Sequence, residues 1–289
     1  MKQLICVLSI FFLQATAGVL ADDVRPFERM DVFGLEWVSD PQIAPNGRRI
    51  VYVRNGMDVM TDGKWSRLWL TDSDGSNNTP LTGRDVNESN PTWSPDGTRI
   101  AFTSKSENGT EIYVTWVESG KTTRLTQLNR PPKGLSWSPD GSQIAFRMLV
   151  PEESVVLVKA PKKPDDAEWS DAPRVTARLK YETDGAGYVE PGFEQFFVIS
   201  ALGGSPRQVT DGNFRHGGTV QWSQDGNSLI FSGNRNDGWE LDYGNTEIYR
   251  VSLESGAVVA LTDRRGPDTE PVVSPDGRKI AYRSRSCTS

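Results

Sequence analysis

The chain has 289 residues, and 32 lysine and arginine residues against 38 aspartate and glutamate residues leave a net charge of −6 at pH 7. This length allows one or two domains. The acidic balance excludes a nucleic-acid-binding protein, because phosphate recognition needs clustered lysine and arginine side chains.

The first 21 residues are predicted to be a secretory signal peptide. Lys2 provides a positive start, residues 4–13 are almost entirely apolar, and small residues offer cleavage after Ala17 or Ala21. The apolar run is too short to span a bilayer with ease. We therefore expect an exported protein, periplasmic or secreted, with no membrane span after cleavage. The single cysteine outside the signal leaves no disulfide framework in the mature chain.

Five copies of one short turn run through the rest of the chain. Their tips are Asn46-Gly47, Asp96-Gly97, Asp140-Gly141, Asp225-Gly226 and Asp276-Gly277. In each copy the Asx side chain is expected to bond to nearby backbone, and the glycine to take the positive-φ position. An apolar triplet begins three residues after each glycine. Because side chains alternate along a strand, Ile100 and Phe102 should face one way and Ala101 the other, towards a close contact with the next unit.

Two more strands are predicted after each of the first four triplets. The third strands cover residues 67–70, 111–114, 196–199 and 247–251, and the fourth end at Leu81-Thr82, Leu125-Thr126, Val209-Thr210 and Leu261-Thr262. Four antiparallel strands in a unit of about 45 residues are typical of a β-propeller blade. A β-sandwich is the weaker alternative, since it needs no such regular motif. The sequence therefore predicts an all-β propeller of four-stranded blades.

The blades are expected to start near residues 41, 91, 135, 220 and 271. The third repeat is longer than the others, because Gly141 and Gly226 are 85 residues apart. We expect an insertion hairpin over 150–192, with a strand at 175–181 and a turn at 184–188.

The last repeat has only its first two strands, and residues 285–289 lack the propeller pattern. Residues 22–284 are therefore predicted to form four complete blades and half of a fifth. Such a ring is open, and its sheet edges are exposed.

A search for catalytic chemistry finds little. The chain has one histidine, His216, and no Gly-x-Ser-x-Gly motif, so no catalytic residue is assigned and His216 is expected to lie in a loop. No cluster of cysteine and histidine indicates a metal site. Asp72-Ser73-Asp74-Gly75 begins like a calcium loop but lacks the later ligands, so it is interpreted as a turn. No cofactor is expected.

One charged segment lies outside the repeat pattern, between the second and third strands of the fourth blade. Its residues Arg235, Asp237, Trp239 and Glu240 are candidates for substrate gating, because acids and aromatic rings can receive a cationic peptide N-terminus. The alternative is a solvated loop with a packed tryptophan.

Three groups of motifs resemble the N-terminal propeller of an exported prolyl oligopeptidase family serine peptidase, in the branch of acylaminoacyl peptidases and bacterial dipeptidyl peptidases. They are Arg25-Pro26-Phe27 with residues 38–43, Arg178-Leu179-Lys180-Tyr181 with residues 184–188, and Thr210-Asp211-Gly212 with His216-Gly217 and residues 232–235. The Ser-Pro-Asp-Gly turns are shared with TolB-like periplasmic propellers.

The resemblance implies a seven-bladed propeller followed by an α/β-hydrolase domain with catalytic Ser, Asp and His. No position of this chain matches those catalytic residues. We therefore expect a non-catalytic, truncated propeller portion of a peptidase, whose partners would be the hydrolase domain and short peptides and whose role would be to restrict access to the active site. The alternative is a TolB-like protein-binding scaffold with no enzymatic activity.

Overall fold

The computed structural model describes residues 25–152, 161–170, 175–185 and 187–285. The predicted signal peptide and residues 286–289 lie outside the described residues. The described part is built of strands, apart from one short 3₁₀ helix, η1 (Arg29–Gly34). No helix in it is long and apolar enough to cross a membrane.

The strands of the described residues form four successive four-stranded antiparallel sheets, a final two-stranded sheet, and a separate two-stranded hairpin in the third blade. The sheets are β1 (Glu36–Ile43), β2 (Arg49–Asp58), β3 (Gly63–Asp72) and β4 (Thr79–Pro80); β5 (Glu88–Trp93), β6 (Arg99–Ser106), β7 (Gly109–Trp116) and β8 (Thr122–Arg124); β9 (Lys133–Trp137), β10 (Gln143–Pro151), β13 (Gly192–Ser200) and β14 (Arg207–Gln208); β15 (Arg215–Trp222), β16 (Ser228–Asn234), β17 (Glu247–Ser252) and β18 (Val258–Ala260); and β19 (Asp268–Val273) with β20 (Ile280–Ser284). Chain order equals strand order within every sheet. The all-β prediction of four propeller blades and half of a fifth is confirmed.

The turn between the first two strands of a blade is closed by its own side chains. In the third blade Ser138 Oγ donates to Asp140 Oδ1 over 2.6 Å, and the backbone N–H of Ser142 donates to the same oxygen over 3.0 Å. These hydrogen bonds lower the pKa of Asp140 to about 2. Gly141 has a φ of +68°, which a side chain would strain. The local sequence is therefore sufficient to form this turn.

The hydrophobic core lies between neighbouring blades. Fully buried Ile100 and Phe102 of β6 pack towards the first blade, against Val51 and Leu68 respectively, through separate clusters. Ala101 packs the other way, into the cluster with the third blade. The predicted alternation is confirmed, and the small residue lets the next sheet approach closely.

A series of tryptophan hydrogen bonds also joins the blades. The indole Nε1–H of Trp93 donates to the carbonyl of Gln42 over 2.9 Å, that of Trp137 to Thr92 over 3.1 Å, and that of Trp222 to Ser136 over 3.0 Å. Each bond links a blade to the blade before it. The fifth blade has Val273 at this position and cannot continue the series.

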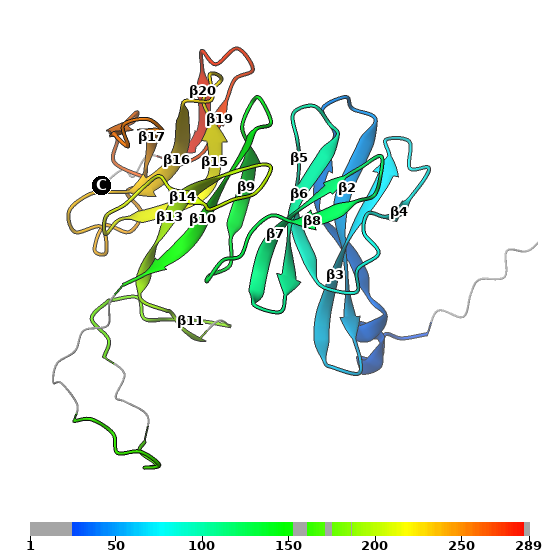
Figure 1. Ribbon diagram of the computed structural model, residues 1–289, viewed down its shortest axis with the longest axis horizontal. Coiled ribbons are helices and arrows are strands. Elements are labelled where there is room, and N and C mark those ends of the chain that lie inside the picture. Colours follow the sequence, from blue (N-terminus) through cyan, green and yellow to red (C-terminus); the bar gives the residue numbers. More distant parts are fainter. Residues whose placement is uncertain (1–24, 153–160, 171–174, 186, 286–289) are drawn as a thin grey trace, which may run out of the picture.

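The two ends of the blade array do not pair with each other. In Figure 1 the first sheet, in blue and cyan, is separated from the red β19 and β20 by the green and yellow sheets. Nearly all of β1 is exposed, including Trp37, Val38 and Ile43, and most of β20 is exposed as well. The ring is open, as predicted.

The insertion of the third blade contains a small hairpin, β11 (Glu182–Thr183) paired with β12 (Gly187–Tyr188). The prediction of a strand at 175–181 is wrong, because these residues carry no strand pairing. Their alternating sequence suits a strand, but a strand needs a hydrogen-bonding neighbour along its length. Among the described residues of this stretch only Tyr181 has one, since its carbonyl accepts from the backbone N–H of Val189 over 2.8 Å. The insertion leaves the blade at Pro151 and returns at Gly192, which pair across β10 and β13.

Candidate functional site

Consecutive antiparallel strands place their connections at alternate ends of each blade. The repeated Asx-Gly turns therefore lie at one end. The connections between second and third strands lie at the other end, which we call the loop face; their described residues are 59–62, 107–108, 152, 161–170, 175–185, 187–191 and 235–246. Both long interruptions of the repeat belong to the loop face.

The 235–246 segment keeps its shape through Asn234, which is buried at the end of β16. Its side-chain amide donates to the carbonyl of Asp242 over 2.7 Å, and its Oδ1 accepts from the backbone N–H of Asn236 over 3.2 Å. Asp237 is exposed on this segment, whereas Trp239 and Glu240 are half-buried.

Arg178 of the insertion connects the two long segments of the loop face. Its Nη2 lies 2.5 Å from Glu152 Oε2, and its Nη1 lies 3.7 Å from Glu240 Oε1. The guanidinium lies over two aromatic rings, 4.1 Å from the Phe193 centroid and 5.7 Å from the Trp239 centroid. Two of the four gating candidates, Trp239 and Glu240, therefore contact the insertion. We call these five residues the Arg178 cluster.

Arg235, a third gating candidate, lies apart from the Arg178 cluster. Its Nη1 donates to Nε2 of His216 over 2.6 Å, and its guanidinium lies 4.4 Å from the Phe214 centroid. Burial lowers the pKa of Arg235. The structure thus places Arg235 with His216, and not with Trp239.

The expectation that His216 lies in a loop is wrong. His216 is a buried residue of β15, and it is the sixth residue after Thr210, just as Glu88 and Asp268 follow Thr82 and Thr262. All three are buried polar residues at the first or second position of the first strand of their blade. The spacing from the threonine is the sequence signal that could have placed His216 in the sheet.

Both ring nitrogens of His216 are engaged. Nδ1 lies 2.9 Å from the carbonyl oxygen of Glu194, so it carries the proton, and Nε2 accepts from Arg235. Burial, together with the charges of Arg235 and Arg147, lowers the pKa of His216 to about 4. The imidazole is neutral at pH 7 and has no free nitrogen for base catalysis in this arrangement.

Sequence reasoning missed a second group on the loop face, made of Lys180, Arg215 and Tyr243. Arg215 Nη2 donates to Tyr243 Oη over 2.7 Å and its guanidinium lies 3.8 Å from the ring centroid. The Lys180 ammonium lies 5.6 Å from the same centroid. The hydrogen bond from Arg215 and the nearby cations lower the pKa of Tyr243. We call these three residues the Tyr243 group.

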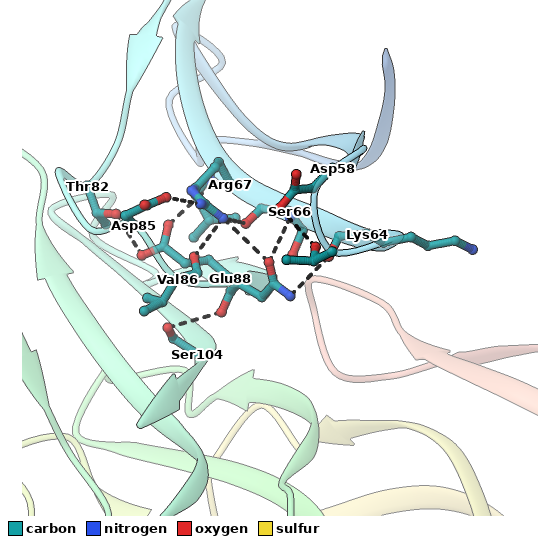
Figure 2. Close-up of polar contacts among 12 residues, drawn as sticks. Asp58, Lys64, Ser66, Arg67, Thr82, Asp85, Val86, Glu88 and Ser104 are labelled. Atoms are coloured by element: carbon teal, nitrogen blue, oxygen red, sulfur yellow. Dashed lines mark hydrogen bonds and ion pairs between the residues drawn. The ribbon is translucent and has the colours of Figure 1, made fainter. Parts of the chain in front are cut away.

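The first blade departs from the repeat at Arg67, as Figure 2 shows. The other blades have Glu111, Gln195 and Glu247 at this position. Arg67 instead forms an ion pair with Asp85 and donates to the carbonyl of Val86 over 3.1 Å. The carboxylate that the position lacks comes from the following blade.

That carboxylate belongs to Glu88, which accepts from Thr82 Oγ1 over 2.6 Å and from the backbone N–H of Leu68 over 3.3 Å. Burial raises the pKa of Glu88. Beside this network lies an open hollow of about 570 Å³, whose lining includes Phe33, Trp65 and Trp69. Among the described residues no group of three or more His, Cys, Asp or Glu side chains could hold a metal ion.

Comparisons with known proteins agree with the propeller fold. Residues 168–288 match the family described as "Dipeptidyl peptidase IV (DPP IV) N-terminal region". The chain is 30% identical over 213 residues to the "Uncharacterized peptidase YuxL" of Bacillus subtilis, covering 71% of this chain and 30% of that protein. It spans 30% to 37% of the length of three curated peptidases that it matches, YuxL and two proteins named "Dipeptidyl-peptidase 5" from Porphyromonas gingivalis and Porphyromonas endodontalis.

Solved structures show the same fold. An acylaminoacyl peptidase in complex with Z-Gly-Gly-Phe-chloromethyl ketone superposes with a TM-score of 0.62 at 16% identity, over 86% of this chain and 35% of that chain. TolB from Acinetobacter baumannii superposes with a TM-score of 0.51 at 18% identity, over 89% of this chain and 49% of that chain.

The fold defines a class, the β-propellers of four-stranded blades. Within that class, the family and sequence matches identify the chain as a propeller segment of the kind found at the N-terminus of prolyl oligopeptidase family peptidases. The predicted resemblance to the N-terminal propeller of a prolyl oligopeptidase family peptidase is confirmed.

Proposed function

We propose that this propeller segment is the substrate-access cap of an exported serine peptidase. Its partner would be an α/β-hydrolase domain that releases dipeptides or acylated amino acids, and its ligands would be short peptides. The observation that carries the proposal is the Arg178 cluster. Because it joins the two long interruptions of the repeat, the loop face is one built surface, while the other end has short repeated turns. Function in scaffold proteins concentrates in such loops.

The loop face offers groups for a peptide N-terminus. Asp237 is exposed, and Trp239, two residues further along the same segment, is half-buried, so an ammonium group could meet a carboxylate and an aromatic ring on this segment. Glu240 stands near Arg178 and would hold the segment in place. Arg235 is held by His216, so its role is to position the segment and not to contact peptide.

Calorimetric titration of the purified chain with trialanine and with acetyl-trialanine tests the proposal. We expect trialanine to bind more tightly, and Trp239→Ala to weaken that binding about tenfold through loss of the aromatic contact. Trp116→Ala is the matched control, since Trp116 is also partly exposed but lies at the opposite end of its blade. Equal weakening by both variants, or none by Trp239→Ala, would contradict the proposal.

Two further observations bear on partner and location. A transcript that continues in frame from codon 289 into a Gly-x-Ser-x-Gly region would support the hydrolase partner, and intergenic sequence there would oppose it. Export predicts a mature N-terminus at residue 18 or 22, measurable by N-terminal sequencing of the isolated protein.

A TolB-like protein-binding scaffold is the second candidate function. The superposition on TolB over 89% of this chain and a 60-residue stretch that is 38% identical to a Tol-Pal system protein TolB favour it. Peptide binding that depends on Trp239 would favour the peptidase cap. Capture of a folded protein partner with no peptide binding would favour the scaffold.

A further inference from the structure

The Tyr243 group brings together side chains from three segments that are distant in the sequence. Lys180 comes from the insertion of the third blade, Arg215 from the first residue of β15, and Tyr243 from the 235–246 segment. Only Arg215 belongs to a strand of the repeat, and Lys180 and Tyr243 come from its two long interruptions. Their convergence on one ring is a product of the tertiary structure.

The two cations of the Tyr243 group are not neutralised. Elsewhere on the third blade arginines have carboxylate partners, such as Arg130 with Glu190 and Arg178 with Glu152, both at 2.5 Å. Within the described ranges no Asp or Glu oxygen lies within 4.0 Å of Arg215 or Lys180. Both cations contact the Tyr243 ring and neither has a carboxylate partner in the described part, so an anion bound close to both would be stabilised.

The group is also pre-organised and accessible. Stacking on Tyr243 and the hydrogen bond to its Oη fix the plane of the Arg215 guanidinium and use one of its five N–H donors. The remaining donors can bind a carboxylate with two parallel hydrogen bonds. The phenol accepts from Arg215 and keeps its own proton to donate. Tyr243 is 50% exposed, so a ligand can reach it.

We propose that Arg215, Lys180 and Tyr243 form a carboxylate-binding site that recognises the C-terminal carboxylate of a short peptide. The inference rests on the proposed function, because it names a part of the peptide that the loop face would hold. It is independent of the groups assigned to the peptide N-terminus, Asp237 and Trp239. A carboxylate also occurs on acidic side chains, and the test separates the two sources.

Calorimetric titration with three peptides tests the site: trialanine, trialanine amide, and alanyl-glutamyl-alanine amide. We expect trialanine to bind about tenfold more tightly than its amide, as a charge-assisted bidentate contact implies. The preference should decrease as salt is raised, because the site is exposed. Weak binding of the glutamyl amide would support the C-terminal carboxylate, and strong binding would overturn it in favour of any peptide carboxylate.

Variants test which side chains cause the preference for trialanine over its amide. Arg215→Gln and Lys180→Gln should each reduce trialanine binding towards the level of the amide and leave amide binding unchanged. Arg215→Lys keeps the charge without the fork and should restore only part of the preference. Tyr243→Phe keeps the ring, so the chain should still fold. It should weaken the binding of trialanine and leave the binding of the amide unchanged. Lys121→Gln, an exposed lysine at the turn end of the second blade, is the control.

The outcomes are distinguishable. Equal binding of trialanine and its amide, or an unchanged preference in Arg215→Gln, would overturn the carboxylate site and leave the proposed function standing. Absence of binding by all three peptides would overturn both. A thermal melt of each variant confirms that the chain is folded in the titration.

Discussion

His216 illustrates how one residue can connect two blades. Its Nδ1–H donates to the Glu194 carbonyl of the third blade, and its Nε2 accepts from Arg235 at the start of the 235–246 segment. The ring lies edge-on to Phe231, with 5.2 Å between centroids. Because one nitrogen donates and the other accepts, only the neutral tautomer with a proton on Nδ1 satisfies both contacts.

This arrangement predicts an acid-dependent loss of stability. The pKa of His216 falls from 6.5 to about 4 on folding, mainly because burial disfavours the charged ring; Arg235 and Arg147 also oppose the charge, and the Glu194 carbonyl and Asp211 favour it. The contribution of His216 is complete above pH 6.5 and is lost as the pH falls towards 4, because only the unfolded chain binds the proton in that window. The loss is about 3 kcal/mol.

Urea unfolding at pH 7.5 and pH 4.5 measures the loss. His216→Gln is the matched variant, since its amide can donate to the Glu194 carbonyl and accept from Arg235 without titrating. The variant should lose less stability between the two pH values than the natural chain. The same pH dependence in both proteins would show that other groups, such as the carboxylates, account for it.

At the scale of the element, a clasp between the third and fourth strands recurs in the blades. Thr126 Oγ1 accepts from the backbone N–H of Ile112 over 2.9 Å and donates to Glu111 Oε2 over 2.6 Å. Glu111 also accepts from the backbone N–H of Leu128 over 3.0 Å. The carboxylate is buried, and these donors satisfy it. In the first blade the clasp survives the change to Arg67 because Glu88 supplies the carboxylate.

The clasp predicts that loss of a single threonine hydroxyl lowers the free energy of unfolding strongly. Thr126→Val keeps the side-chain shape but leaves the Glu111 carboxylate and the Ile112 N–H with fewer partners, so the free energy of unfolding should fall by about 3 kcal/mol. Thr123→Val, on the exposed face of β8, should change it by less than about 0.5 kcal/mol. Denaturant titration compares them, and similar losses in both variants would contradict a role for the clasp.

At the scale of the whole molecule, we expect the open ends of the blade array to determine whether the chain self-associates. Each inner blade is covered on both sides, whereas β1 exposes Trp37 and Val38 along an unpaired edge. An edge strand with exposed apolar residues is a template for pairing with another chain.

We therefore expect the purified chain to self-associate as its concentration rises, and Val38→Lys to reduce the association by placing a charge on the edge. Val38 is 60% exposed, so the change should not disturb the core. Val59→Lys, on the loop between β2 and β3, is the control and should have no effect. Sedimentation velocity measures the outcome, and a monomer with a single cooperative melt at every concentration would count against the open edge.

The sequence alone predicted much of the scaffold, because its signals are local. A turn such as Ser138 to Gln143 is closed by bonds that span at most five residues, and the alternation at Ile100, Ala101 and Phe102 follows from strand geometry. The same local logic misjudged residues 175–181, where only Tyr181 at the end finds a backbone partner, and His216, whose place in a strand depends on partners in two blades.

What the sequence determined by itself was therefore the blade, the number of blades and the propeller class, since each repeat encodes its own turns and faces. What only the tertiary structure decided was which interruptions of the repeat meet. Arg178 reaches Trp239 and Glu240, and Lys180 joins Arg215 and Tyr243, across gaps of about 35 to 65 residues. No local pattern predicts such contacts, because they depend on how adjacent blades pack and on the end of the blade at which each loop lies.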